Sequence, residues 1–255
     1  MVKLGGGCVV LSPDDGDRQE VGTESARLTI GAAIDARDIA QCVRTFAPGL
    51  SRGRMNPASE EVHFVVRGHG ACYIDGHRYG LEPGSAVYVP PGTDACFEAG
   101  GPDALEVVSV CCPGPAAAEI DLPPRTVPED RVSTPPFRVV QEHDRKTIPT
   151  GERTFKLLAD KDVGCQRVTQ FLGVIPPSVA PPHYHTYEEA IYILDGEGVL
   201  WAEDVETPVG QGSCIYLPRG VRHSLQNHGS HPIRLLGVFH PSGSPAARYG
   251  DEGAH

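Results

Sequence analysis

The chain has 255 residues and a formal net charge of −11, from 33 acidic and 22 basic side chains. This length is enough for two domains of ordinary size, and the sequence has no run of about 18 apolar residues that could cross a membrane as a helix. An acidic chain without a basic cluster also argues against a nucleic-acid partner.

The start of the chain and its cysteines indicate a cellular compartment. Residues 1–7 end in three glycines and are too short for a secretory signal. The eight cysteines form no Cys-x-x-Cys pair, and most of them lie in apolar, strand-like runs. We therefore expect reduced thiols in a cytoplasmic protein, not a disulfide framework.

Residues 1–112 are predicted to form a first domain made of short strands. Apolar runs occur at 8–11, 27–30, 39–46, 62–66, 71–74, 85–89 and 105–110, and clusters of glycine or proline separate many of them. The chain as a whole has 30 glycines and 24 prolines, as many turns between short strands require. The pattern indicates an all-β fold.

Residues 113–136 carry repeated prolines and are predicted to form a stiff, extended connector without a strand ladder. Strand-like runs resume at 137–141, 165–175, 190–194, 214–217 and 235–239. Residues 137–255 are therefore expected to form a second domain, with a frayed polar tail from about 242 onward.

The second domain holds a set of metal-ligand residues. His183, His185 and Glu189 lie within seven residues of one another, and His223 follows after a further strand-like stretch. Alternate residues of a strand share a face, so the first two imidazoles project together, and a turn at 186–188 could aim Glu189 back toward them. Imidazole and carboxylate suit one divalent Fe, Mn, Ni, Co, Cu or Zn ion, and four such ligands leave about two octahedral positions open for catalysis.

The spacing of these residues resembles the paired motifs of the cupin superfamily. Its first motif is matched by the histidines, the glutamate and Gly196, and its second by Gly212, Pro218, Gly220, His223 and Asn227. The family often has a glycine where this chain has Pro177, which we interpret as a change of loop. The resemblance implies a double-stranded β-helix, or jelly roll, in which His183, His185, Glu189 and His223 hold the metal.

An internal repeat predicts a second barrel of the same kind. Glycines and prolines of the motifs recur 128 residues apart, and Glu61 lies at the position of Glu189. The other three ligand positions hold Met55, Pro57 and Ala95, which cannot replace imidazoles. We expect two tandem barrels packed as an internal pseudo-dimer, with metal in the C-terminal one alone.

The role of the first barrel has two interpretations. It stabilises the second barrel, or it holds a metal-free pocket for an effector. The structural role is favoured because the sequence shows no alternative polar cluster there, and strand positions explain His63 and His69. In the second half, Asn227 shares a face with His223, whereas Tyr192 is expected to pack between the barrels or to face outward.

The function has three competing interpretations. The favoured one is an enzyme that binds a small oxygen-bearing substrate at the metal, and the resemblance to bicupin dioxygenases suggests a dioxygenase. The enzyme could instead be a non-oxidative isomerase, lyase, decarboxylase or hydrolase. The other two interpretations are a binding module without turnover and a structural protein. Glu189 is the candidate catalytic residue, and we expect a small-molecule partner, no membrane partner, and a homodimer.

Overall fold

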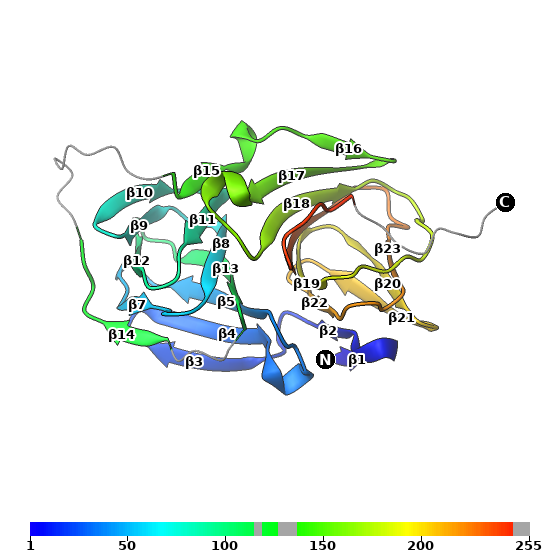
Figure 1. Ribbon diagram of the computed structural model, residues 1–255, viewed down its shortest axis with the longest axis horizontal. Helices are drawn as coiled ribbons and strands as arrows, with labels where there is room; N and C mark the ends of the chain where they lie inside the picture. Colours follow the sequence, from blue (N-terminus) through cyan, green and yellow to red (C-terminus); the bar gives the residue numbers. More distant parts are fainter. Residues whose placement is uncertain (115–118, 127–136, 247–255) are drawn as a thin grey trace.

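The computed structural model describes residues 1–114, 119–126 and 137–246 of the chain. Within these residues the secondary structure is β-strand, apart from 3-10 helices of three residues each. The strands form two barrels that lie side by side, with the blue to cyan half of the chain on the left of Figure 1 and the yellow to red half on the right. The predicted all-β architecture of two tandem jelly-roll barrels is thus confirmed.

The N-terminal barrel is built from a seven-stranded and a five-stranded sheet. The first sheet has the order β15-β11-β8-β13-β5-β4-β3 and the second β10-β9-β12-β7-β14. In chain order these strands are β3 Asp17–Val21, β4 Glu24–Ile30, β5 Ala40–Phe46, β7 Gly53–Met55, β8 Glu60–Arg67, β9 Gly70–Ile74, β10 His77–Leu81, β11 Ser85–Val89, β12 Asp94–Ala99, β13 Leu105–Cys112, β14 Ile120–Leu122 and β15 Val139–Gln141. The short strand β6, Gly49–Leu50, lies beside β12.

The C-terminal barrel is built from an eight-stranded and a three-stranded sheet. Their orders are β1-β2-β22-β19-β24-β18-β17-β16 and β21-β20-β23. The strands are β1 Val2–Lys3, β2 Val9–Leu11, β16 Ile148–Thr150, β17 Arg153–Ala159, β18 Thr169–Ile175, β19 Glu188–Asp195, β20 Glu197–Ala202, β21 Val205–Gly210, β22 Cys214–Leu217, β23 His223–Gln226 and β24 Ile233–His240. The 3-10 helices are η1 Gly5–Gly7, η2 Ala32–Ile34, η3 Glu142–Asp144 and η4 Lys161–Val163.

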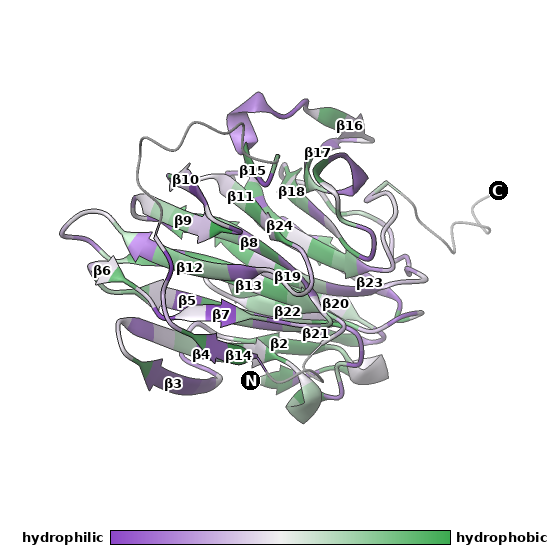
Figure 2. Cartoon of the chain, turned by 60° about the vertical axis from the view of Figure 1, so that its left-hand side comes forward, coloured by the Kyte–Doolittle hydropathy of each residue, from purple (hydrophilic) through white to green (hydrophobic). Residues whose placement is uncertain are grey.

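The barrels bury three large hydrophobic clusters and one of three residues, because each large sheet is covered on both faces. Strand β19 shows how this arises: Ile191 and Ile193 face the interior of the C-terminal barrel, whereas Tyr192 and Leu194 face the core between the barrels. A strand buried on both faces needs a continuous apolar run, which explains the run at 190–194. Tyr192 packs between the barrels, as its position in the strand predicts, and its hydroxyl contacts Glu106. Hydrophobic residues concentrate along these central strands in Figure 2.

Two short segments pair with the barrel encoded by the other half of the sequence. Strand β2 adds to β22 of the C-terminal barrel, and β15 adds to β11 of the N-terminal barrel. Both pairings are visible in Figure 1, where dark-blue β2 lies beside β22 and green β15 beside β11. The predicted domain ranges 1–112 and 137–255 therefore do not coincide with the sheets, which exchange these strands.

The connector differs from its prediction. Its described part contains β14, which pairs antiparallel with β7 of the N-terminal barrel, so a strand ladder does form there. The carboxylate of Glu119 contacts Arg44 at 3.1 Å and Arg52 at 2.8 Å, which draws this segment onto the barrel. Residues 115–118 and 127–136 of the connector, and 247–255 of the predicted tail, lie outside the described residues.

A pair of equivalent carboxylates joins the two barrels. Glu188 accepts hydrogen bonds from the backbone N–H groups of Arg37 at 2.9 Å and Asp38 at 2.7 Å. Glu60, which lies 128 residues earlier, accepts the corresponding bonds from Gln166 at 2.8 Å and Arg167 at 2.9 Å. The internal repeat therefore extends from the barrels to the contacts between them, as in a symmetric dimer.

The glycine of the first motif has a conformational reason in both barrels. Gly68 and Gly196 have positive φ angles of 85° and 86°, which side chains other than glycine rarely adopt. A Cβ atom would lie 2.4 Å from the carbonyl oxygen of Ala104 at the first and 2.8 Å from that of Pro232 at the second. Both features require glycine where the chain turns between two adjoining strands.

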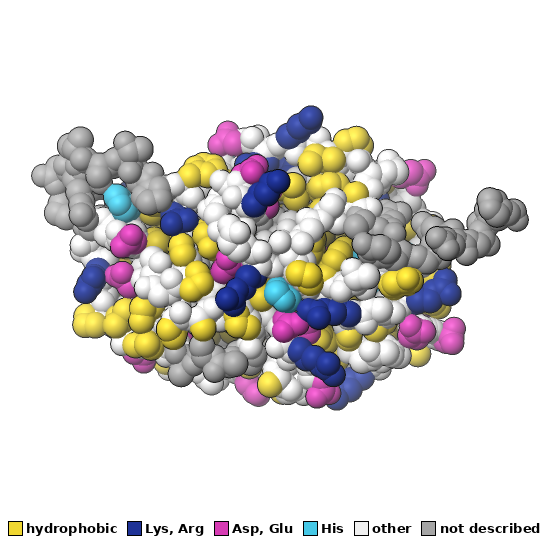
Figure 3. Space-filling view, in the orientation of Figure 1, with side chains coloured by type: hydrophobic (Ala, Val, Ile, Leu, Met, Phe, Trp, Pro, Cys, Tyr) yellow, Lys and Arg dark blue, Asp and Glu magenta, His cyan; other side chains and the backbone are white. Residues whose placement is uncertain are grey.

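The cysteines form no disulfide bonds, and the surface in Figure 3 carries charges of both signs. All eight cysteines are free thiols, and six of them are buried. No helix in the described residues has the length and apolar character needed to span a membrane. On the face shown in Figure 3, Lys and Arg side chains are interspersed with Asp and Glu side chains.

Candidate metal centre

Backbone pairing brings the two histidine segments together. His183 and His185 lie in the extended segment that precedes β19, and His223 begins β23. His183 and His223 form an antiparallel bridge in which each N–H donates to the carbonyl of the other, at 3.0 and 2.8 Å. The N–H of Gly220 donates to the carbonyl of His185 at 2.8 Å, which fixes the next residue pair. The two motifs are thus held in register by main-chain hydrogen bonds.

Carbonyl groups orient two of the imidazole rings. The Nδ1 atom of His223 lies 2.9 Å from the carbonyl oxygen of Val221, and that of His183 lies 3.3 Å from the carbonyl oxygen of Pro181. A carbonyl oxygen can only accept, so each Nδ1 carries the proton and each Nε2 keeps its lone pair. Partners of this kind commonly fix the tautomer of metal-binding histidines.

The three imidazoles form a nearly equilateral triangle. Their ring centroids are 4.8 Å apart for His183 with His185, 4.8 Å for His183 with His223, and 5.0 Å for His185 with His223. One ring nitrogen from each lies within 4.8 Å of the others, and all three side chains are buried. The ring of His185 also stacks on Tyr187, with centroids 4.4 Å apart. This geometry can hold one metal ion between three nitrogens.

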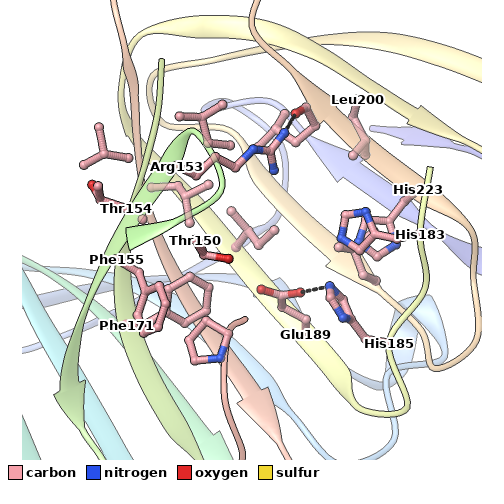
Figure 4. Close-up of a pocket in the computed structure, with 18 of the residues that line it drawn as sticks. Thr150, Arg153, Thr154, Phe155, Phe171, His183, His185, Glu189, Leu200 and His223 are labelled. Carbon is pink, nitrogen blue, oxygen red and sulfur yellow. Dashed lines mark hydrogen bonds and ion pairs between the residues drawn. The ribbon is translucent and has the colours of Figure 1, made fainter. Parts of the chain in front are cut away.

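Glu189 is the fourth predicted ligand, and it faces the same space. Its Oε2 lies 3.9 Å from Nε2 of His185, as Figure 4 shows. Glu188 and Glu189 are adjacent in β19 and therefore point to opposite faces, one toward the N-terminal barrel and the other into the cavity. All four predicted side chains line this cavity; the three histidines form the group whose ligand atoms lie within 4.8 Å of one another, and Glu189 contacts His185 beside that group.

The electrostatics of the cluster suit a metal cation. Burial raises the pKa of the Glu189 carboxyl to about 8. Burial lowers the pKa of His223 to about 4, assisted by His183 and opposed by the Val221 carbonyl. His223 is therefore neutral near pH 7, with a lone pair to donate. A buried carboxylate of this kind gains most from a divalent ion beside it.

The cluster lies at one side of a cavity inside the C-terminal barrel. The cavity opens to solvent, and the empty space between its lining residues is about 700 Å³ when that open mouth is counted. Most of its wall is apolar, with Phe155, Phe171, Leu200, Leu217, Leu225 and Leu235 among the lining residues. The polar lining residues outside the cluster include Thr150, Arg153 and Thr154 near the mouth, which Figure 4 labels.

Comparison with known proteins identifies the family. The family model described as "Cupin domain" matches residues 42–111 and 171–239. The chain belongs to the cupin family. Because the match occurs twice, in the two barrels in turn, this cupin is a bicupin. The expected resemblance is therefore confirmed.

Solved structures with this bicupin fold include oxalate decarboxylase of Bacillus subtilis. A deletion mutant of that enzyme aligns with a TM-score of 0.78 and 14% identity, covering 96% of this chain and 79% of the enzyme. The structure of the same enzyme at pH 4.6 gives a TM-score of 0.77, also at 14% identity, over 96% of this chain and 78% of that one. At this level of identity the likeness shows the fold alone.

Sequence relatives of the cupin are partial matches. Gentisate 1,2-dioxygenase of Ralstonia sp is 30% identical over 100 residues, which is 36% of this chain and 28% of the relative. The tetracenomycin polyketide synthase protein TcmJ of Streptomyces glaucescens is 28% identical over 95 residues, covering 36% and 62%. An uncharacterised protein of Methanocaldococcus jannaschii is 33% identical over 58 residues, covering 23% and 46%. The chain thus spans less than two thirds of the length of each of these relatives.

The N-terminal cupin has a different interior. The equivalent positions hold Met55, Pro57 and Ala95, and in the described residues the group of side chains arranged to hold a metal is the C-terminal histidine triad. Glu61 occupies the position of Glu189, but Arg54 lies beside it, with NH2 3.6 Å from its Oε2. Burial by itself would raise the pKa of Glu61. Arg54, together with His63, outweighs burial and lowers that pKa to about 2.

The expectation that the N-terminal half lacks a polar cluster is wrong. Arg54, Glu61 and His63 are all buried, and Nδ1 of His63 lies 2.8 Å from the hydroxyl of Ser109. The guanidinium of Arg54 also lies 3.6 Å from Glu24 and above the ring of Phe97. The sequence signal was present, because arginine stands where the repeat has Pro182 in the other half. In this barrel an arginine, held between two carboxylates, supplies the buried positive charge.

Other side chains suggested by the sequence lie outside the cavity wall. Asn227 is buried, but its amide donates to the carbonyls of Ile175 at 2.9 Å and His231 at 2.8 Å, so it braces the backbone after β23. Arg153 lines the cavity, but the sequence did not predict it, because a single arginine at the start of a strand does not show which way its side chain faces. Its parity with Phe155, another cavity residue, was the available clue.

Proposed function

We propose that this bicupin binds one divalent transition metal per chain and acts as a metal-dependent enzyme on a small, oxygen-bearing substrate. The proposed ligands are His183, His185, Glu189 and His223. The observation that carries the proposal is the buried triangle of imidazoles beside the carboxyl group of Glu189. The equivalent carboxylate in the other barrel has Arg54, so a positive charge is supplied there by the protein.

The residues fit such a metal in donor type and burial. Three imidazoles and one carboxyl group, without a thiol, suit Fe, Mn, Ni, Co, Cu or Zn. When bound, the metal would polarise substrate oxygen or support redox chemistry, depending on its identity. The chain itself would contribute the apolar wall, which excludes water, and Glu189, which we propose as the catalytic residue through transfer of a proton.

A dioxygenase is the favoured reaction class. Gentisate 1,2-dioxygenase is among the sequence relatives, and its name describes a dioxygenase that acts on gentisate. A non-oxidative lyase, isomerase or hydrolase is the second candidate, which the shared fold with oxalate decarboxylase favours. A cupin that binds a small ligand without turnover is the third. We also retain the cytoplasmic location, the small-molecule partner, the absence of nucleic-acid and membrane partners, and a homodimer as proposals.

Oxygen uptake separates these reaction classes. The chain would be loaded with Fe(II) or Cu(II) and mixed with catechols, diketones and flavonols in an oxygen electrode. A dioxygenase consumes oxygen only when the metal and one substrate class are both present. Glu188→Gln, which alters the neighbouring carboxylate on the opposite face of β19, serves as the matched control for Glu189→Gln. Substrate loss without oxygen uptake would instead favour the non-oxidative enzyme.

A further inference from the structure

Strand β3, Asp17–Val21, is an outer edge of the seven-stranded sheet and pairs with β4 on one side only. Figures 1 and 2 both place it at the rim of the N-terminal barrel. All five of its side chains are exposed, so both faces of the strand are in water. On the side away from β4, its backbone groups make no hydrogen bond within the described residues. An edge of this kind can accept another strand.

The order of the charges on β3 suits pairing with a second copy of the same strand. Arg18 and Glu20 lie on one face of β3, with Gln19 between them in the sequence. When two copies meet antiparallel about a two-fold axis at Gln19, Arg18 of each copy lies opposite Glu20 of the other. Charged residues on an edge strand usually oppose pairing, but opposite charges at facing cross-strand positions stabilise it.

The same charges disfavour the neighbouring registers. A two-fold axis perpendicular to the sheet keeps like faces together, so the residue opposite Arg18 can be Arg18, Glu20 or Gly22 of the other copy. The first choice places Arg18 opposite Arg18, and the third places Glu20 opposite Glu20, and like charges at facing positions are destabilising. The middle choice instead places Gly16 opposite Gly22, two turn residues with positive φ angles of 106° and 60°. Charge therefore selects the register centred on Gln19.

The contacts of β3 within one chain favour the same arrangement. Arg18 lies opposite Arg27 of β4, so its cross-strand neighbour carries the same charge. Arg27 is buried and donates hydrogen bonds to two backbone carbonyls of the loop before β3, which fixes its position. A carboxylate on the open side of Arg18 would offset this repulsion. The hydroxyl of Ser25 holds the carboxylate of Glu20 at 2.6 Å and thereby orients it on this face.

We propose that β3 is a dimer interface, at which two copies of the chain pair edge to edge with Arg18 of each copy bound to Glu20 of the other. The two seven-stranded sheets then form one continuous sheet across the two-fold axis. This inference rests on the homodimer proposed above and names its interface. A five-residue strand is smaller than the about 20–30 residues per side of a standard interface, so the dimer should be weak and reversible.

Sedimentation velocity over a series of protein concentrations tests this interface with the full chain. Wild type should show a monomer–dimer equilibrium whose dissociation constant rises with salt, because exposed ion pairs are screened. Arg18→Glu should raise the dissociation constant about tenfold or more, because both symmetric contacts become repulsive. Adding Glu20→Arg to Arg18→Glu exchanges the two charges and should restore dimerisation. Lys146→Glu, an equal charge change at an exposed residue outside β3, should leave the dissociation constant unchanged.

The dimer interface and the metal site fail separately. A wild-type chain that stays monomeric at every concentration overturns the inference, and so does a dimer that Arg18→Glu leaves unchanged. Failure of the double variant to dimerise also overturns it, provided that its circular dichroism spectrum matches that of wild type. Co(II) titration of the same variants reports on the other barrel and should give the same stoichiometry in each. Absence of Co(II) binding by wild type would refute the proposed metal site but leave the dimer measurements valid.

Discussion

Removing Arg54 should lower the folding stability, because the carboxylate of Glu61 would stay buried without its cation. The ordinary glutamate pKa of 4.5 is lowered to about 2 at Glu61, where burial opposes the shift and Arg54 drives it. A difference of this size corresponds to about 3 kcal/mol of folding free energy. Arg54→Met leaves the carboxylate buried without its cation, and breaking a buried pair in this way costs about 3–5 kcal/mol near pH 7.

The folding stability of wild type and of Arg54→Met should change in opposite directions as the pH falls. In wild type the folded pKa lies below the unfolded value, so this contribution is present above pH 4.5 and is lost as the pH falls toward 2. In Arg54→Met, burial dominates and raises the pKa of Glu61, in the way it raises that of Glu189 to about 8. The variant therefore regains stability as the pH falls from 7, and its deficit relative to wild type shrinks.

Urea unfolding followed by circular dichroism from pH 4 to 8, with a chelator present, measures this deficit. Adding Glu61→Gln to the Arg54→Met variant should recover much of the lost stability and flatten its pH dependence. Arg67→Met is the matched surface control, because Arg67 pairs with Glu106 at 2.8 Å but is 70% exposed, and its loss should cost within about 1 kcal/mol. A deficit that is equal at pH 7 and pH 4 would refute the reasoning.

Two further pairs of substitutions test the packing of the barrels, each by urea unfolding. Glu60→Gln should destabilise the chain by about 1.5–3 kcal/mol, because it weakens two charge-assisted hydrogen bonds from backbone N–H groups of the other barrel. Glu188→Gln should destabilise the chain by a similar amount for the same reason. Unchanged stability in either variant would argue against this role of the two carboxylates. Gly237→Ala should cost about 1–3 kcal/mol by overpacking, because its Cβ would lie 2.3 Å from the ring of Phe171, whereas Gly210→Ala meets open space and should stay within about 0.5 kcal/mol.

The repeat made much of the fold predictable. The offset between Glu61 and Glu189 implied two barrels, and apolar runs located strands such as β11 and β22. The exchange of β2 and β15 between barrels was not predictable, because an apolar strand fits any open sheet edge. Its partner is set by which edge the folded barrels leave uncovered.

The proposed metal ligands and the surrounding polar residues differ in how strongly the sequence indicates them. The proposed ligands lie in two paired motifs, each with fixed spacing, so the pattern points to all four. Arg54 and Arg153 carry no motif, and strand parity alone does not show whether a charged residue faces a cavity, a carboxylate or water. The contacts of Arg54 are with Glu61, seven residues later, and with Glu24, 30 residues earlier, and Arg153 binds the carbonyl of Leu225, 72 residues later.

The most direct test of the account is the metal content of the chain purified from its native host, measured by elemental analysis. The account predicts about one divalent transition metal per chain in wild type and in Glu188→Gln, and loss of that metal in His183→Ala and in Glu189→Gln. Two metals per chain, no metal in wild type, or an unchanged content in His183→Ala would contradict it.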